Sequence, residues 1–189
     1  AIAQAGEITV DNLKDGTTYV IAVAASNKEV YSEVKSIEMA TDKDLSGPAV
    51  FDRQVAGGYY GIPEGGRYGE YLVILADGEA VGADGVYATI GAGRTMSLNL
   101  YQFAPTNMNN IVLPDRTYKY ATDKSISTFH PAKTYCMVND GKGNITRTDF
   151  KAGTISVKKA GSTYTITATL TTTDDEEFTT SYEIGRAHV

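Results

Sequence analysis

The stretch Ser162-Thr163-Tyr164-Thr165-Ile166-Thr167-Ala168-Thr169-Leu170-Thr171 decides the fold class. Its even positions from Tyr164 to Leu170 are apolar and alternate strictly with threonines, the period of two that is typical of a strand with one buried face. Residues 154–158 are expected to pair with it through a turn around Lys159-Ala160-Gly161, and residues 178–182 to form the return strand. Together they predict a three-stranded antiparallel meander.

The rest of the chain beyond residue 49 repeats this pattern in shorter segments. Gly, Asn and Asp turns separate the apolar segments at spacings of about ten residues, and no segment keeps a helical period for three turns. Further strands are expected at residues 57–61, 70–76, 86–90, 96–101, 118–121, 134–138 and 144–150. Residues 70–76 are apolar on both faces, which favours the centre of a sheet. We therefore predict an all-β domain over residues 49–183, an antiparallel β-sandwich or a flattened β-barrel.

Composition excludes several classes of protein. The chain has 189 residues, of which 42% are hydrophobic and 21% charged, as in a folded globular protein. A net charge of −6 without a Lys/Arg cluster excludes a general nucleic-acid binder. No apolar run approaches the ~18 residues of a membrane helix. A single cysteine, Cys136, provides neither an internal disulfide nor a thiolate zinc site.

The first 42 residues have the pattern of a different β domain. A short strand is expected at residues 7–10, Asp15-Gly16 forms a turn, and residues 20–25 are apolar on both faces. Leu13 followed six residues later by Tyr19 matches a tyrosine corner. This segment resembles the last three strands of a fibronectin type III domain, an immunoglobulin-like sandwich. The resemblance implies a missing N-terminal half, exposed apolar faces and a spacer role; residues 43–48 are the expected linker.

The larger domain resembles, in the order of its motifs, the C-terminal β module of uncharacterised surface lipoproteins of Bacteroidetes. The matching motifs are Gly58-Tyr59-Tyr60-Gly61, Tyr71-Leu72-Val73-Ile74-Leu75, Leu98-Asn99-Leu100-Tyr101, Leu113-Pro114-Asp115-Arg116-Thr117-Tyr118 and Gly153-Thr154-Ile155-Ser156-Val157. The resemblance implies an extracellular location at the cell surface and membrane attachment only through an N-terminal lipid anchor outside this fragment. It implies no particular activity.

Both ends of the chain are expected to be artificial. The chain starts at Ala1 and shows no signal segment, so we expect the true N-terminus to be missing. Residues 184–189 resemble the translation of a sequencing adapter, which indicates a non-native tail on a metagenomic fragment. His188 is accordingly excluded as a ligand or catalyst.

Tyrosines gather around a Gly-rich loop at residues 62–67. Flat aromatic rings with polar edges suit sugars, so the predicted ligand-binding residues are Tyr59, Tyr60, Arg67, Tyr68 and Tyr87. A fainter candidate is the Asn-rich loop 106–110, whose amides can bond hydroxyls. The alternative interpretation is that these tyrosines face the core or cover strand surfaces without a ligand, and the absence of Trp weakens the sugar hypothesis.

Signals of catalysis are sparse. His130 and Cys136 form a conceivable nucleophilic pair, but residues 134–138 have the pattern of a buried strand. Carboxylates that could act in glycoside hydrolysis lie only in expected turns, where we expect them to be solvated: Asp77, Glu79, Asp84 and those of residues 174–177. They are at most weak evidence for a calcium site. The prediction is a non-catalytic, cofactor-free surface module that binds a glycan or another surface protein. The alternatives are a structural spacer or adhesin segment without a small ligand and, less favoured, a glycoside-active enzyme.

Overall fold

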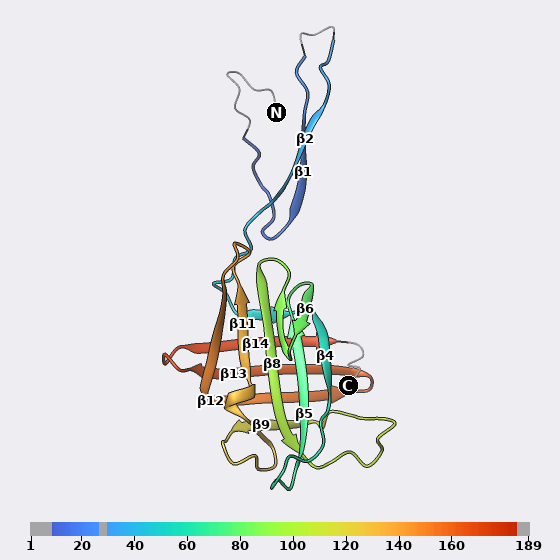
Figure 1. Cartoon of the computed structure of the whole chain (residues 1–189), viewed down its shortest axis with the longest axis vertical. Helices are drawn as coiled ribbons and strands as arrows, with labels where there is room; N and C mark the ends of the chain where they lie inside the picture. Colours follow the sequence, from blue (N-terminus) through green and yellow to red (C-terminus); the bar gives the residue numbers. More distant parts are fainter. Residues whose placement is uncertain (1–8, 27–29, 185–189) are drawn as a thin grey trace. The chain divides into compact units, whose positions relative to one another are not determined.

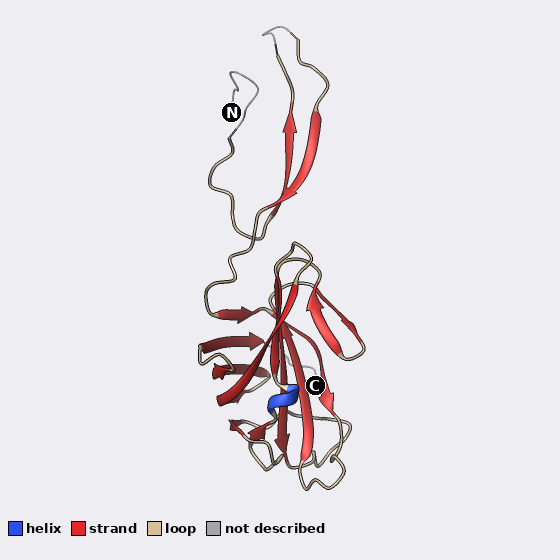
Figure 2. Ribbon diagram, turned by 60° about the vertical axis from the view of Figure 1, so that its left-hand side comes forward, coloured by secondary structure: helices blue, strands red, loops and turns tan. Residues whose placement is uncertain are grey.

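The computed structural model describes residues 9–26 and 30–184 and shows an all-β protein. The chain divides into two units, Ala1–Asp44 and Leu45–Val189, each of which is described by itself. The predicted tail lies outside the described residues except for the backbone of residue 184. Figure 2 shows one short helical element, the 3-10 turn η1 (Pro131–Lys133), and within the described ranges no helix is long and apolar enough to cross a membrane.

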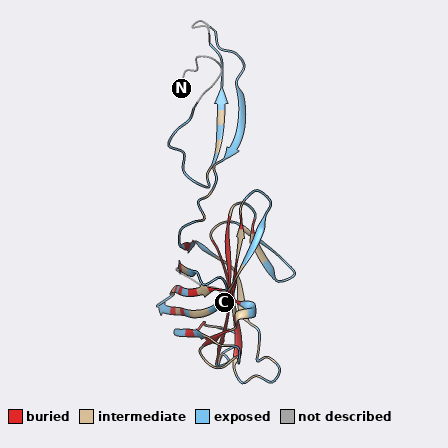
Figure 3. Cartoon of the chain, turned by 90° about the vertical axis from the view of Figure 1, so that its left-hand side faces the viewer, coloured by how far each residue is buried: buried red, intermediate tan, exposed pale blue. Residues whose placement is uncertain are grey.

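The smaller unit contains one antiparallel pair, β1 (Thr18–Val23) and β2 (Lys35–Ala40). The expected strand at residues 7–10 is wrong in its described half: Thr9 and Val10 are not in a strand. A strand requires a paired edge, and within the described residues β1 and β2 pair only with each other. Most residues of the two strands are exposed (Figure 3), among them the apolar Val20 at 69%, whereas Tyr19 and Ile21 are half-buried. The Lys14 N–H donates to the Tyr19 hydroxyl at 2.9 Å.

The larger unit is built around one ten-stranded sheet in the order β3-β14-β13-β12-β9-β10-β8-β5-β4, in which β11 pairs with both β12 and β8. Its strands are β3 (Ala49–Phe51), β4 (Arg53–Tyr59), β5 (Gly69–Ala76), β8 (Gly93–Gln102), β9 (Arg116–Tyr120), β10 (Thr128–Phe129), β11 (Tyr135–Asn139), β12 (Ile145–Ala160), β13 (Thr163–Thr172) and β14 (Glu177–Ile184). A separate hairpin consists of β6 (Ala80–Ala83) and β7 (Val86–Thr89). The predicted meander is confirmed as β12-β13-β14.

The sheet folds over on itself. Figure 1 shows β13 and β14 running across β5 and β8, and the two ends of the sheet, β3 and β4, are separated in the chain only by Asp52. β12 joins the two layers: its first part pairs with β11 and its second with β13, across a bulge between Phe150 and Ala152. The predicted strands at 144–150 and 154–158 are therefore one strand, because the bulge lets the chain bend without ending. The result is a sandwich-like flattened barrel.

The core lies between the two layers (Figure 3). The alternating residues of β13 point into it as predicted, since Tyr164, Ile166, Ala168 and Leu170 are all at most 4% exposed. β8 differs because it is buried on both faces. Its outer face is covered by two elements: the Thr95 hydroxyl donates to the carbonyl of Tyr87 in β7, and the Ser97 hydroxyl to that of Lys133 in η1. Polar residues on this face are thus enclosed.

Candidate functional site

A buried carboxylate occupies the outer face of β5. Tyr71, Val73 and Leu75 of this strand face the core, so the alternation of a strand turns Glu70 to the opposite side. Glu70 is 9% exposed and pairs in register with Tyr101 of β8. β5 is central, between β4 and β8, as predicted from its apolar pattern.

Three side chains from two other elements converge on this carboxylate. Glu70 Oε1 accepts hydrogen bonds from Asn99 Nδ2 at 2.7 Å and from Lys133 Nζ at 2.5 Å. Glu70 Oε2 accepts only a long bond of 3.4 Å from the Tyr101 hydroxyl. Asn99 is fully buried, and its Oδ1 has no hydrogen-bond partner. The cluster therefore retains unused acceptor capacity at two oxygens.

The backbone of Asn99 holds η1 over the cluster. The His130 N–H donates to the Asn99 carbonyl at 3.1 Å, and the Asn99 N–H donates to Thr134 Oγ1 at 3.0 Å. His130 caps the turn, because its Nδ1 accepts the N–H of Ala132, and Pro131 provides the fixed φ of the first position. Lys133 is thus brought to Glu70 by a short turn anchored on both sides.

Electrostatics set the protonation states of the cluster. Burial raises the pKa of Glu70, but hydrogen bonds from Lys133 and Asn99 outweigh burial and hold this pKa below its usual range. Burial, reinforced by the charge of Glu70, raises the pKa of Tyr101 to about 12. Burial, followed by nearby lysines, lowers the pKa of His130. At neutral pH the cluster therefore holds an ionised carboxylate, a protonated phenol and a neutral imidazole.

A shallow groove of about 260 Å³ opens beside this carboxylate; we call it the Glu70 groove. Its lining residues come from β5, β8, β11, η1, the tip of the β6–β7 hairpin and the position after β4: Tyr60, Glu70, Leu72, Gly85, Ser97, Ala132, Lys133 and Tyr135. Tyr60 is 65% exposed, and its N–H donates to the Glu70 carbonyl at 2.8 Å. The ring of Tyr135 is covered by Arg147, whose guanidinium carbon lies 4.0 Å from the ring centroid.

The five predicted binding residues are not brought together. Only Tyr60 lines the Glu70 groove; Tyr59, its neighbour in the chain, packs on Tyr71 of the core at 5.1 Å between ring centroids. Arg67 is exposed in its loop, whereas Tyr68 is half-buried and meets the ring of Phe103 edge-on at 5.6 Å. Tyr87 is half-buried in β7, paired with Gly82 across the hairpin.

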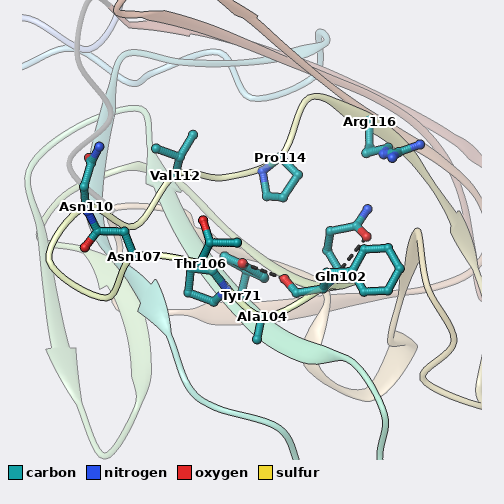
Figure 4. Close-up of a pocket in the computed structure, with 11 residues that line it drawn as sticks. Tyr71, Gln102, Ala104, Thr106, Asn107, Asn110, Val112, Pro114 and Arg116 are labelled. Carbon is teal, nitrogen blue, oxygen red and sulfur yellow. Dashed lines mark hydrogen bonds between the residues drawn. The ribbon is translucent and has the colours of Figure 1, made fainter.

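A second pocket, of about 390 Å³, lies under the chain between β8 and β9 and is called here the loop pocket (Figure 4). Its lining comprises Tyr71, Gln102, Phe103, Ala104, Pro105, Thr106, Asn107, Asn110, Val112, Pro114 and Arg116. The fainter Asn-rich candidate, loop 106–110, thus borders a pocket through three of its residues, Thr106, Asn107 and Asn110.

The side chains considered as weaker catalytic candidates lie in the core or in turns of the fold. Cys136 is fully buried in the core, and burial raises the pKa of its thiol to about 12, which leaves no nucleophilic thiolate at neutral pH. Asp77 Oδ1 accepts the N–H of Arg94 at 2.6 Å, and Asp84 sits at positive φ in the β6–β7 turn. No group of three His, Cys, Asp or Glu residues suited to a metal was found in the part of the chain that the structure describes.

Sequence reasoning missed Glu70, Asn99 and Lys133. The available signals were Glu70, a charged residue at the start of an apolar strand, and Asn99, a polar residue between Leu98 and Leu100. Neither signal indicates which residue lies next to it in the fold. Comparisons with protein-family models, curated proteins and solved structures found no match.

Proposed function

We propose that the larger unit is a non-catalytic carbohydrate-binding module of an extracellular cell-surface protein and that one sugar ring binds in the Glu70 groove. The observation that carries this proposal is the preorganised Glu70–Lys133 pair, at 2.5 Å, beside the exposed ring of Tyr60. Sugars present adjacent hydroxyls that both donate and accept hydrogen bonds. An ionised carboxylate next to an ammonium group matches such a diol.

The pair has capacity left for a ligand. Glu70 Oε2 accepts only the long hydrogen bond from Tyr101. The ammonium group of Lys133 uses one of its donors on Glu70, and the Lys133 side chain is 58% exposed. One ligand hydroxyl can donate to Glu70 while its neighbour accepts from Lys133. Because Asn99 already fixes the carboxylate, little side-chain entropy is lost on binding.

Tyr60 supplies the stacking surface. The ring of Tyr135 already carries Arg147 on one face, whereas Tyr60 projects from the end of β4 with 65% of its surface exposed. An aromatic face beside polar groups suits the apolar face of a pyranose ring. Among the lining residues of the groove Glu70 is the only carboxylate, whereas glycoside hydrolysis generally uses two, which supports binding rather than cleavage.

The smaller unit supports the cell-surface part of the proposal. The bond from the Lys14 N–H to the Tyr19 hydroxyl ties the start of β1 to the preceding corner, as a tyrosine corner does in immunoglobulin-like sandwiches. We therefore propose that residues 1–42 belong to a fibronectin type III-like domain that acts as a spacer.

The test is a glycan-array screen of the full chain, followed by calorimetric titration of the strongest hit. Tyr60→Ala and Glu70→Gln are each expected to weaken binding about tenfold or more, as the loss of a stacking ring or a charged hydrogen bond does. Tyr31→Ala is the matched control, because Tyr31 is 76% exposed and lies in the smaller unit. Equal affinity of all three folded variants would overturn the site. Silence across the array would favour a structural spacer instead.

A further inference from the structure

We propose that the loop pocket binds a small amphipathic anion, a molecule with an apolar body and one carboxylate or sulfonate group. This site is separate from the Glu70 groove, with which it shares no lining residue. Its volume of about 390 Å³ lies within the range of roughly 300–1,000 Å³ that is usual for small-molecule pockets.

Two tyrosines of the core hold the walls of the pocket in place. The Tyr71 hydroxyl donates to the Phe103 carbonyl at 2.8 Å, where the chain leaves β8. The Tyr118 hydroxyl donates to the Pro114 carbonyl at 3.1 Å, where the chain returns to β9. Both rings are at most 1% exposed, so the anchors are rigid. The pocket is therefore preformed, which lowers the entropic cost of binding.

The tip of the loop is also ordered by its own hydrogen bonds. Asn107 Oδ1 accepts the N–H of Asn109 at 2.9 Å, and the Asn107 carbonyl accepts the N–H of Asn110 at 3.2 Å. These bonds form an Asx-type turn that closes one end of the pocket.

One part of the lining is an apolar wall. It consists of Phe103, Ala104, Pro105, Val112 and Pro114, which offer no side-chain hydrogen bond. Phe103 is 60% exposed although it is large and apolar, and a ligand that covered it would remove this surface from water. A sugar carries hydroxyls around its whole ring and would leave several of them against this wall. An apolar body fits the wall better than a polyol.

Polar groups lie at both ends, as Figure 4 shows, with Asn107 and Asn110 at one end and Arg116 at the other. Thr106 and Gln102 lie between them, and the Gln102 amide already bonds the Phe103 N–H and the Ser127 hydroxyl. Arg116 makes no ion pair or side-chain hydrogen bond to any described residue. The lining contains no Asp or Glu, so an anion meets no like charge there. A guanidinium fork matches the two oxygens of a carboxylate, which assigns the anionic group to this end.

The absence of Trp from the chain gives a direct way to locate a bound probe. The probe is 8-anilinonaphthalene-1-sulfonate, an aromatic body with one anionic group, titrated against two full-length variants. Met108→Trp places a reporter in the loop at a residue that is 60% exposed and outside the lining. Tyr31→Trp places one in the smaller unit, whose exposed apolar strands could also attract the probe. Quenching by energy transfer is expected to saturate at a lower probe concentration with the Met108→Trp reporter.

The contribution of the Arg116 charge to anion binding is tested by adding Arg116→Gln to the Met108→Trp variant. We expect affinity for the sulfonate probe to fall about threefold to fivefold, the range of a solvent-exposed charge pair. Lys119→Gln is the matched control on the same strand and is expected to change nothing. The uncharged analogue N-phenyl-1-naphthylamine is expected to bind both variants alike.

Three outcomes would overturn the proposal. One is preferential or exclusive quenching of the Trp at position 31. Another is absence of quenching at both reporters. The last is equal weakening of the sulfonate probe by Arg116→Gln and Lys119→Gln. None of these outcomes bears on sugar binding in the Glu70 groove, which is tested with different residues and a different ligand.

Discussion

Replacing Lys133 by Met is expected to destabilise the larger unit in a pH-dependent way. The ammonium group of Lys133 is 2.5 Å from Glu70 Oε1, and the side chain of Glu70 is only 11% exposed. Met keeps most of the apolar stem of the lysine and removes the charge. Breaking a fully buried ion pair costs about 3–5 kcal/mol, whereas exposed pairs are worth less than ~1 kcal/mol. Because Lys133 is 58% exposed, we expect a loss of about 1–2 kcal/mol at neutral pH.

The sign of the pH dependence follows from the pKa of Glu70. In the native protein this pKa lies below its usual value, so the ionised carboxylate adds stability above the unfolded pKa of about 4.3. That contribution disappears as the pH falls through the folded pKa. Without Lys133, burial is the largest remaining influence and raises the pKa of Glu70. The difference between the two proteins should therefore be largest near pH 7 and should shrink below about pH 4.

The measurement is urea unfolding followed by circular dichroism at about pH 7 and about pH 3.5, with NMR titration of the Glu70 carboxyl. Lys158→Met is the control, because its ammonium group lies 3.8 Å from Asp115 and both side chains are largely exposed; we expect a loss below ~0.5 kcal/mol. A loss for Lys133→Met that is equal at both pH values, or an unchanged pKa of Glu70, would refute the reasoning.

Three further predictions concern the frame of the larger unit. Gly153→Val is expected to cost more than ~3 kcal/mol in thermal or urea unfolding, because the residue has φ +121° at the β12 bulge and a Cβ there would overlap the carbonyl of Thr169; unfolding like the parent would contradict this. Tyr118→Phe should cost about 1 kcal/mol and speed hydrogen exchange in the 103–115 loop, since it removes the bond to Pro114. The Cys136 thiol should react with a disulfide reagent only after denaturation, and rapid reaction of the native chain would show that the core opens.

Local periodicity explains why most strands were predictable. The alternation in residues 163–171 indicates a strand that is buried on one face. The apolar pattern of residues 70–76 indicates a strand that is buried on both faces. Both patterns can be read directly from the side chains of the segment itself. β12 shows the limit of this reasoning. The pattern predicts two strands, at residues 144–150 and 154–158, and only the pairing with β11 and β13 shows that the backbone continues through a bulge between them.

The candidate site was less predictable. Tyr59 and Tyr60 are adjacent in the chain and therefore face opposite sides, yet the pattern alone did not indicate which of them meets solvent. Glu70, Asn99 and Lys133 are separated by up to 63 residues and were individually unremarkable. Their convergence depends on β5 pairing with β8 and on η1 packing against β8 so that Lys133 reaches Glu70, which no local pattern contains.

The sequence by itself determined the all-β class, the turns and the buried face of the clearest strand, since these follow from glycine conformations and from the two-residue period of apolar side chains. Tertiary structure decided which strands are neighbours, that β3 and β4 form the two ends of one sheet and which polar residues meet. The physical reason is that strand pairing joins distant segments through backbone hydrogen bonds that are the same for every sequence. The choice among pairings is made by packing of the whole core, and the same packing brings Glu70 and Lys133 together.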